Sequence, residues 1–249
     1  MTAGNFAARA EILKLARVLG VEPENLDYLE RVDEDDLRAF REQVTDTLFD
    51  ANLVVLQRMA LASRLLPGAV LAKIAERVFG PMLCARIAGL VDVNRGIDVA
   101  KRLSPRFLAE VAAELDPRRA SAIIARIPLD TVVEVARELT RREDWITLGR
   151  FVGHLPDATV QRSLEVVGDA DLLRIAFVLD DKSRIDHVVA LLPAGRLTKV
   201  LRATVDDEDL WDPALDLITH LNDARLDTVL ALVDELPAGL RERVQATIR

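Results

Sequence analysis

The side chains best suited to chemistry are few in this sequence and stand far apart. There are three histidines, His154, His187 and His220, and one cysteine, Cys84. No His-Glu-x-x-His pattern and no second histidine at helical spacing occurs, so a metal site would require the three histidines to converge through the fold. Cys84 stands among apolar residues with no histidine near it in sequence, so we expect a buried, inert thiol. We therefore predict no metal site and no thiol nucleophile.

The sequence also lacks a glycine-rich phosphate loop, so nucleotide-driven chemistry has no visible motif. Its acidic runs, 33–36 and 206–209, are the remaining groups that could act together. Consecutive residues of a helix point in different directions and cannot converge on one ion, whereas carboxylates at a helix N-terminus are stabilised by the helix dipole. We interpret both runs as helix starts, with a divalent-ion contact as the alternative, and predict a protein that is not an enzyme and has no cofactor.

Charge is unevenly distributed along the chain. The net charge of −8 argues against nucleic-acid binding, which needs a basic face. Residues 22–50 are rich in acids, whereas residues 51–91 are apolar and basic, with Glu76 as the single acid among five cations: Arg58, Arg64, Lys73, Arg77 and Arg86. Charge runs usually serve solubility, so two solvated faces are the simpler interpretation. A binding surface is the alternative.

The two tryptophans, Trp145 and Trp211, each stand in the first turn of a predicted helix. Packing at helix junctions is the simpler role for them. Tryptophan is also enriched at the centres of binding interfaces. We therefore name Trp145 and Trp211, together with Arg58, Arg64 and Arg77, as the candidate partner-binding residues.

The elements that carry these residues are predicted to be helical throughout. Half of the residues are apolar but only 4% are aromatic, a composition typical of helices packed on helices. An apolar stripe over residues 5–19 predicts a first helix, which Gly20 ends. Further helices are expected from Pro23 and after the acidic run. Residues 1–92 are thus predicted to form a bundle-like N-terminal helical segment.

After Leu103 the pattern becomes repetitive. Turn residues, often with proline, precede eight to ten residues of helical periodicity, and the predicted units begin at residues 104, 116, 128, 156, 168, 180 and 193. Ser104-Pro105 and Asp116-Pro117 each predict an N-cap followed by proline at the first helical position. Helices this short are marginal alone, so they must stabilise one another by stacking as a solenoid over residues 93–249.

The sequence also contains a longer repeat, in addition to the short one. A shift of 66 residues aligns Trp145 with Trp211 and His154 with His220. We predict five helices in that interval. An odd number reverses direction in a simple up-and-down stack, so a winding arrangement is needed if the two copies are to match.

Two short units have the form Leu-x-Pro: Leu103-Ser104-Pro105 and Leu115-Asp116-Pro117. Each is expected to lead into a helix that ends on Leu or Ile, and serial units of this form carry a family resemblance. In residues 103–139 and 156–205 the chain resembles the N-terminal cytoplasmic domain of MgtE-type magnesium transporters and, more distantly, the flagellar motor-switch protein FliG. The resemblance implies a right-handed superhelix of short stacked helices that acts as a regulatory or docking module. No membrane portion is visible, so ion transport is not carried over.

These patterns predict a non-enzymatic scaffold that binds a protein or regulates one. Two alternatives stay open: a module that binds an apolar or anionic, lipid-like ligand with residues 51–91, and a magnesium-responsive regulatory domain. The start of the sequence shows no secretory pattern, no stretch is apolar enough to span a membrane, and the lone cysteine fits a reducing compartment. We expect a cytoplasmic protein with a protein partner, with a homodimer also open.

Overall fold

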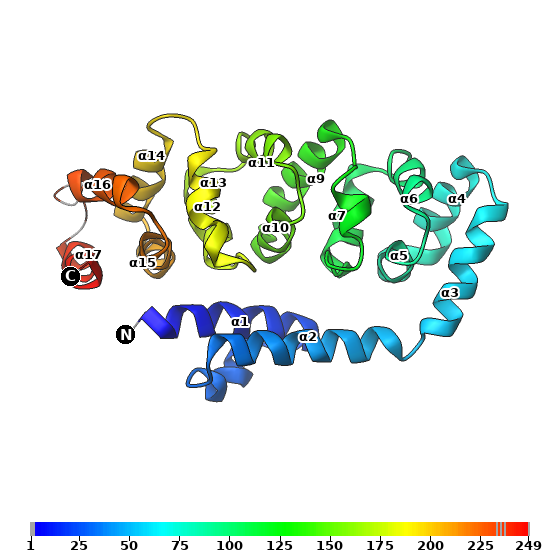
Figure 1. Ribbon diagram of the computed structural model, residues 1–249, viewed down its shortest axis with the longest axis horizontal. Coiled ribbons are helices and arrows are strands. Elements are labelled where there is room, and N and C mark those ends of the chain that lie inside the picture. The colour runs from blue at the N-terminus through cyan, green and yellow to red at the C-terminus, as the bar shows by residue number, and fades with distance from the viewer. Residues whose placement is uncertain (1–2, 233, 235, 237, 249) are drawn as a thin grey trace. The chain divides into compact units, whose positions relative to one another are not determined.

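The computed structural model describes residues 3–232, 234, 236 and 238–248. Within these residues the regular structure is entirely helical, with seventeen α-helices, short 3-10 segments, one π segment and no strand (Figure 1). The predicted all-α fold is confirmed. None of the described helices has the length and apolar character that crossing a bilayer requires.

Contacts group the chain into two compact units. Unit 1 joins Met1–Gln43 to Val167–Arg249, and unit 2 is Val44–Val166. The boundary between residues 43 and 44 falls inside helix α2 (Glu34–Asp50). The division expected between residues 92 and 93 was drawn from sequence character and stays a prediction.

Unit 2 contains nine short helices beyond the end of α2. They are α3 (Leu53–Ala62), α4 (Gly68–Ile74), α5 (Gly80–Ala88), α6 (Val93–Ala100), α7 (Pro105–Glu114), α8 (Ser121–Ile124), α9 (Leu129–Arg141), α10 (Trp145–Val152) and α11 (Asp157–Leu164). A 3-10 segment, η2 (Ser63–Leu65), follows α3, and a π segment, η3 (Ala75–Phe79), joins α4 to α5.

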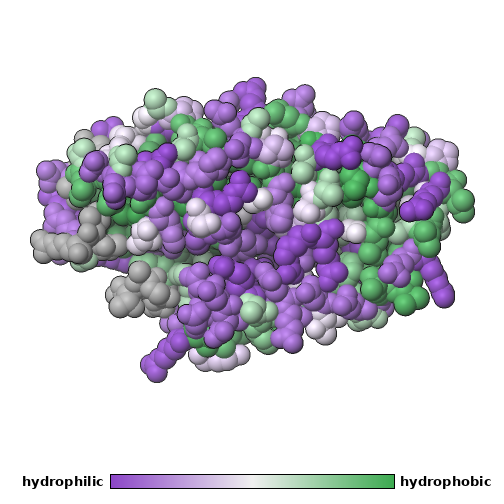
Figure 2. Space-filling model, in the orientation of Figure 1, coloured by the Kyte–Doolittle hydropathy of each residue, from purple (hydrophilic) through white to green (hydrophobic). Residues whose placement is uncertain are grey.

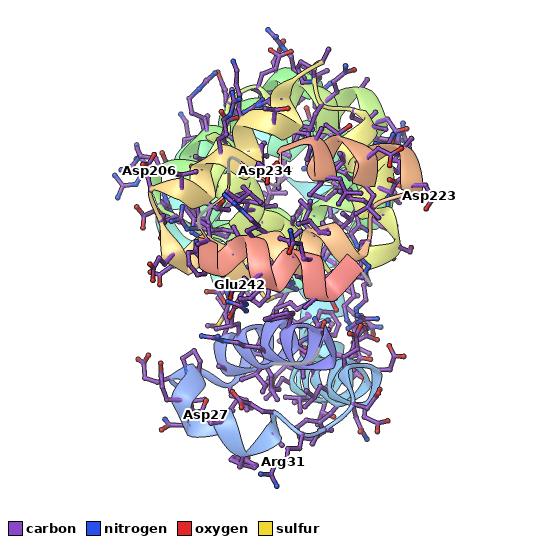
Figure 3. The ribbon with its side chains drawn as sticks, turned by 90° about the vertical axis from the view of Figure 1, so that its left-hand side faces the viewer. Asp27, Arg31, Asp206, Asp223, Asp234 and Glu242 are labelled. Atoms are coloured by element: carbon purple, nitrogen blue, oxygen red, sulfur yellow. The ribbon has the colours of Figure 1, made fainter. Side chains whose placement is uncertain are left out.

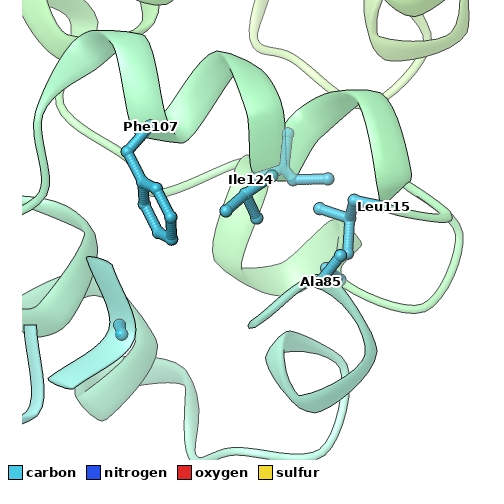
Figure 4. Packing of buried hydrophobic residues seen from close by; sticks show 7 residues of the cluster. Ala85, Phe107, Leu115 and Ile124 are labelled. Carbon is cyan, nitrogen blue, oxygen red and sulfur yellow. The ribbon is translucent and has the colours of Figure 1, made fainter. Parts of the chain in front are cut away.

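Helices two positions apart in the chain pack together in unit 2. The series α3, α5, α7, α9 and α11 is in contact from each helix to the next, and so is the series α4, α6 and α8. A cluster of buried side chains that includes Ala85, Phe107, Leu115 and Ile124 joins neighbouring helices (Figure 4). A helix of four residues such as α8 cannot persist alone, so packing of this kind is what holds it.

Unit 1 joins the first helices of the chain to the last. Besides α2, its elements are α1 (Ala3–Leu19), η1 (Pro23–Leu29), α12 (Asp169–Phe177), η4 (Lys182–Arg184), α13 (Ile185–Ala190), α14 (Arg196–Arg202), η5 (Ala203–Val205), η6 (Glu208–Leu210), α15 (Trp211–Thr219), α16 (Asp223–Leu232) and α17 (Ala238–Ile248). Helix α1 packs against η1, α12 and α15. Its apolar stripe, with Ile12, Leu15 and Ala16, is buried together with Leu26 and Leu37.

Several predicted helix ends are confirmed. Gly20 has a φ of +67° and follows the last residue of α1, and the Ser104 hydroxyl accepts a hydrogen bond from the Phe107 amide at the start of α7. The interval from Trp145 to the residue before Trp211 contains five α-helices, α10 to α14, as predicted.

The helix start predicted at Asp116-Pro117 is wrong. Residues 117–120 form a turn, and α8 begins only at Ser121. The Asp116 carboxylate accepts hydrogen bonds from the amide and the guanidinium of Arg118, two residues ahead. This local pairing favours a turn over a helix cap.

Candidate functional site

Helix α3 is apolar on two opposite faces. One face is buried in unit 2 and carries Leu56 and Ala60, followed by Ser63 just past the end of the helix. On the opposite face Val54 and Leu61 of α3 are exposed, and Leu65 of η2 continues their helical spacing, with Arg58 between Val54 and Leu61. A surface helix normally turns polar side chains outward, so the exposed stripe is an unpartnered apolar face.

The exposed apolar residues continue beyond α3. Eight of the sixteen exposed large hydrophobic side chains of the described chain lie between residues 54 and 82: Val54, Val55, Leu61, Leu65, Leu66, Val70, Val78 and Met82. Leu65 is 85% exposed and Val78 is 73% exposed. Figure 2 shows hydrophobic residues gathered over α3, α4 and α5. With the cations of the same segment, these side chains are called the basic apolar surface.

The cations of this surface are uncompensated. Arg58, Arg64 and Arg77 are exposed and lie on α3, on η2 and, beyond α4, on η3. Among the described residues neither they nor Lys73 and Arg86 form an ion pair, although many arginines elsewhere in unit 2 do: Arg95, Arg102, Arg106, Arg118, Arg119, Arg141 and Arg142. The single acid of the segment, Glu76, accepts a hydrogen bond from the Ser104 amide at 2.7 Å. Three of the five predicted site residues therefore lie exposed in one segment that is both positively charged and apolar.

The tryptophans lie elsewhere. Trp145 is half-buried at the start of α10 in unit 2, and Trp211 begins α15 in unit 1. The Trp211 indole N–H donates to the Thr204 carbonyl at 3.0 Å, and a Cβ at Gly239 would lie 3.0 Å from its ring. These are the contacts of a packing residue. A role for either tryptophan in partner binding stays a prediction.

A buried ionic network in unit 1 has no counterpart in the sequence predictions. The side chains of Glu11 and Lys14 on α1 are 2% and 1% exposed and pair with each other. Arg41 of α2 donates to Glu11 at 2.9 Å, and Asp180, after α12, lies 2.9 Å from the Lys14 ammonium and 3.2 Å from the Arg41 guanidinium. The network links the N-terminal helices to the C-terminal part of the chain.

A second buried pair lies in the same unit. The Lys182 ammonium pairs with Asp216 and donates to the carbonyls of Ala176 and Phe177, at 3.0 and 2.6 Å, at the end of α12. Burial lowers the pKa of Lys182, and Asp216 opposes that shift. His220 Nε2 lies 3.7 Å from Asp216. Because the ammonium is fully occupied in closing a helix, we interpret the pair as structural.

The groups considered for metal or thiol chemistry are dispersed. No group of three or more His, Cys, Asp or Glu side chains within the described residues is placed to hold a metal ion. Cys84 is half-buried, with its Sγ 3.8 Å from the Ala75 carbonyl oxygen, and burial raises its pKa to about 11. Its thiolate is therefore scarce at neutral pH, which makes a nucleophilic role unfavourable.

Comparison of the chain with family models, with curated proteins and with solved structures finds no match. The basic apolar surface is the feature best suited to a binding function. It combines exposed apolar side chains with cations that pair with no acid among the described residues, whereas the charges of the buried network already have partners.

Proposed function

We propose that this chain is a non-enzymatic interaction module that docks a protein partner on its basic apolar surface. The observation that carries the proposal is the exposed stripe of α3 and η2, where Val54, Leu61 and Leu65 flank Arg58, which has no ion pair among the described residues. Contiguous exposed apolar area mixed with charge is typical of a binding surface, because its burial by a partner removes apolar atoms from water.

The chemistry of the surface defines the partner. Arginines without internal acids favour a partner with carboxylates, and the apolar side chains between them favour one that also presents leucine-like residues. An acidic amphipathic helix has both, with apolar anchors at the spacing that a helical stripe can accept. A lipid-like anion would use the same side chains and is the alternative ligand.

The architecture proposed for this module is a right-handed superhelix, as the resemblance to the MgtE-type N-terminal domain and to FliG implies. The contact of helices two positions apart in unit 2 supports a repeating arrangement. A cytoplasmic location fits the lone cysteine and completes the proposal of a scaffold or regulatory protein.

The test is affinity capture from a lysate of the source cells, with captured proteins quantified by mass spectrometry. The variant Arg58→Glu/Arg64→Glu/Arg77→Glu reverses the surface charge. The matched control, Lys101→Glu/Arg106→Glu/Arg137→Glu, reverses three other exposed cations of the same unit and changes the net charge equally. All six side chains are exposed, so both variants should keep their helical content by circular dichroism.

We expect a protein that the wild type and the control capture in stoichiometric amount and that the surface variant loses. Equal capture by the surface variant and the control would contradict docking at this surface. Binding to anionic vesicles with no protein captured would replace the protein partner by a lipid surface.

A further inference from the structure

A second set of exposed residues carries the opposite charge to the basic apolar surface. Five exposed acids, four on η1 or next to it and one in the first turn of α2, form no ion pair within the described residues: Glu22, Glu24, Asp27, Glu30 and Asp36. Exposed apolar side chains accompany them, namely Leu19, Val21, Tyr28, Val32 and Phe40. Figure 3 shows Asp27 and Arg31 at the outer edge of this segment. These residues are called the acidic apolar surface.

The two surfaces are complementary in both properties. Residues 22–36 hold eight acids against the single cation Arg31, and residues 58–86 hold five cations against Glu76. Tyr28 is 74% exposed and Phe40 is 50% exposed, so the acidic surface presents exposed aromatic side chains, which the eight exposed apolar residues of the basic surface do not include. Each surface thus has the composition that the other requires of a partner.

We infer that the partner of the basic apolar surface is the acidic apolar surface of a second copy of this chain. The inference rests on the proposed function and names its partner. Charge complementarity orients the two surfaces and speeds their encounter, and burial of the apolar side chains stabilises the contact. If two copies exchange these contacts reciprocally, each pair forms twice and the assembly closes as a dimer.

Charge favours a second copy over an anionic membrane. Such a membrane attracts the basic surface but repels the rest of the chain, whose acids outnumber its cations. A second copy satisfies both surfaces together. The same argument predicts that salt weakens the association, because the charges involved are exposed.

The test is sedimentation velocity of the full chain over a range of concentrations, at low and high salt. One variant is Arg58→Glu/Arg64→Glu/Arg77→Glu, and a second is Glu24→Lys/Asp27→Lys/Glu30→Lys. Each alone places like charges on both surfaces, so we expect the association constant to fall by about 100-fold. In an equimolar mixture of the two variants, the reversed surface of each variant faces a native surface of opposite charge on the other. The mixture should therefore associate again. The control Lys101→Glu/Arg106→Glu/Arg137→Glu should associate as the wild type does.

A wild type that stays monomeric at every concentration would overturn the inference. So would association that survives either reversal, or a mixture no better than its separate components. Monomeric wild type combined with arginine-dependent capture of another protein would leave the proposed function standing. If the wild type neither self-associates nor captures another protein through these arginines, the proposed function is contradicted as well.

Discussion

At the scale of single residues, the distinctive feature is a set of charges buried against one another in unit 1. The apolar stripe of α1 is predictable from spacing, and Ile12, Leu15 and Ala16 are buried as expected. Glu11 and Lys14 would be assigned to the solvent by the same pattern. Their burial depends on Arg41 and Asp180, up to 166 residues away, and no local signal predicts partners at that distance.

Removing one member of this network should destabilise the fold. In Glu11→Gln the side chain keeps its shape, but Lys14 and Arg41 lose a buried counter-charge, and we expect a loss of about 3 kcal/mol. Glu22 is exposed and has no ion pair within the described part of the chain, so Glu22→Gln should change stability by less than about 0.5 kcal/mol. Urea unfolding followed by circular dichroism measures both. Equal midpoints would show that the network does not stabilise the fold.

Glu138 should make the stability of the fold depend on pH in the acid range. Hydrogen bonds from Arg141 and then Arg142 lower the pKa of this carboxyl to about 2, from an ordinary value of 4.5. Between these values the unfolded chain binds a proton that the folded chain does not, so acid favours unfolding. The contribution is fully present above pH 4.5 and is lost as the pH falls toward 2.

We therefore expect Glu138→Gln to lose less stability than the wild type does over that pH range. Glu134→Gln is the matched control, since Glu134 is exposed on the same helix and has no ion pair among the described residues. Thermal unfolding at a series of pH values compares the three proteins. Parallel profiles for the wild type and Glu138→Gln would contradict the assignment.

At the scale of elements, two copies of one sequence pattern behave differently. Leu103-Ser104-Pro105 begins α7 as predicted, whereas Leu115-Asp116-Pro117 leads into a turn. An arginine stands two residues after both capping positions, Arg106 and Arg118, but the Asp116 carboxylate accepts from the Arg118 guanidinium whereas the Ser104 hydroxyl accepts from the Phe107 amide. Burial opposes the shift, and the Arg118 guanidinium outweighs it and lowers the pKa of Asp116. Proline and a capping residue thus predict where a break occurs but not which structure follows, because a side chain two residues ahead competes for the cap.

The cap of α7 can be tested directly. Ser104→Ala removes the acceptor of the Phe107 amide and should cost about 1 kcal/mol. Ser121→Ala, at an exposed serine inside the first turn of α8, should be nearly neutral. Chemical unfolding of the two variants gives the comparison. A cost for Ser121→Ala that matches or exceeds that of Ser104→Ala would contradict the role of Ser104 as a cap.

At the scale of the whole molecule, the all-α fold and the basic segment could be predicted from composition and charge. The grouping of the first 43 residues with the last helices could not, because it depends on contacts distant in sequence. The sequence also leaves two interpretations of Arg58, Arg64 and Arg77 open. They are exposed and have no ion pair with any residue that the structure describes, and they accompany an outward apolar stripe that begins on α3, which favours a binding surface over a solvated face.

The most direct test of docking at the basic apolar surface is photo-cross-linking in living source cells. A photoreactive residue is placed at Leu65 or Val78, both strongly exposed on that surface, or at the exposed control positions Glu134 or Arg137. We predict a discrete protein adduct from positions 65 and 78, with a second copy of the chain among the products, and none from 134 or 137. No adduct at positions 65 and 78, or equal adducts at all four, would contradict the account.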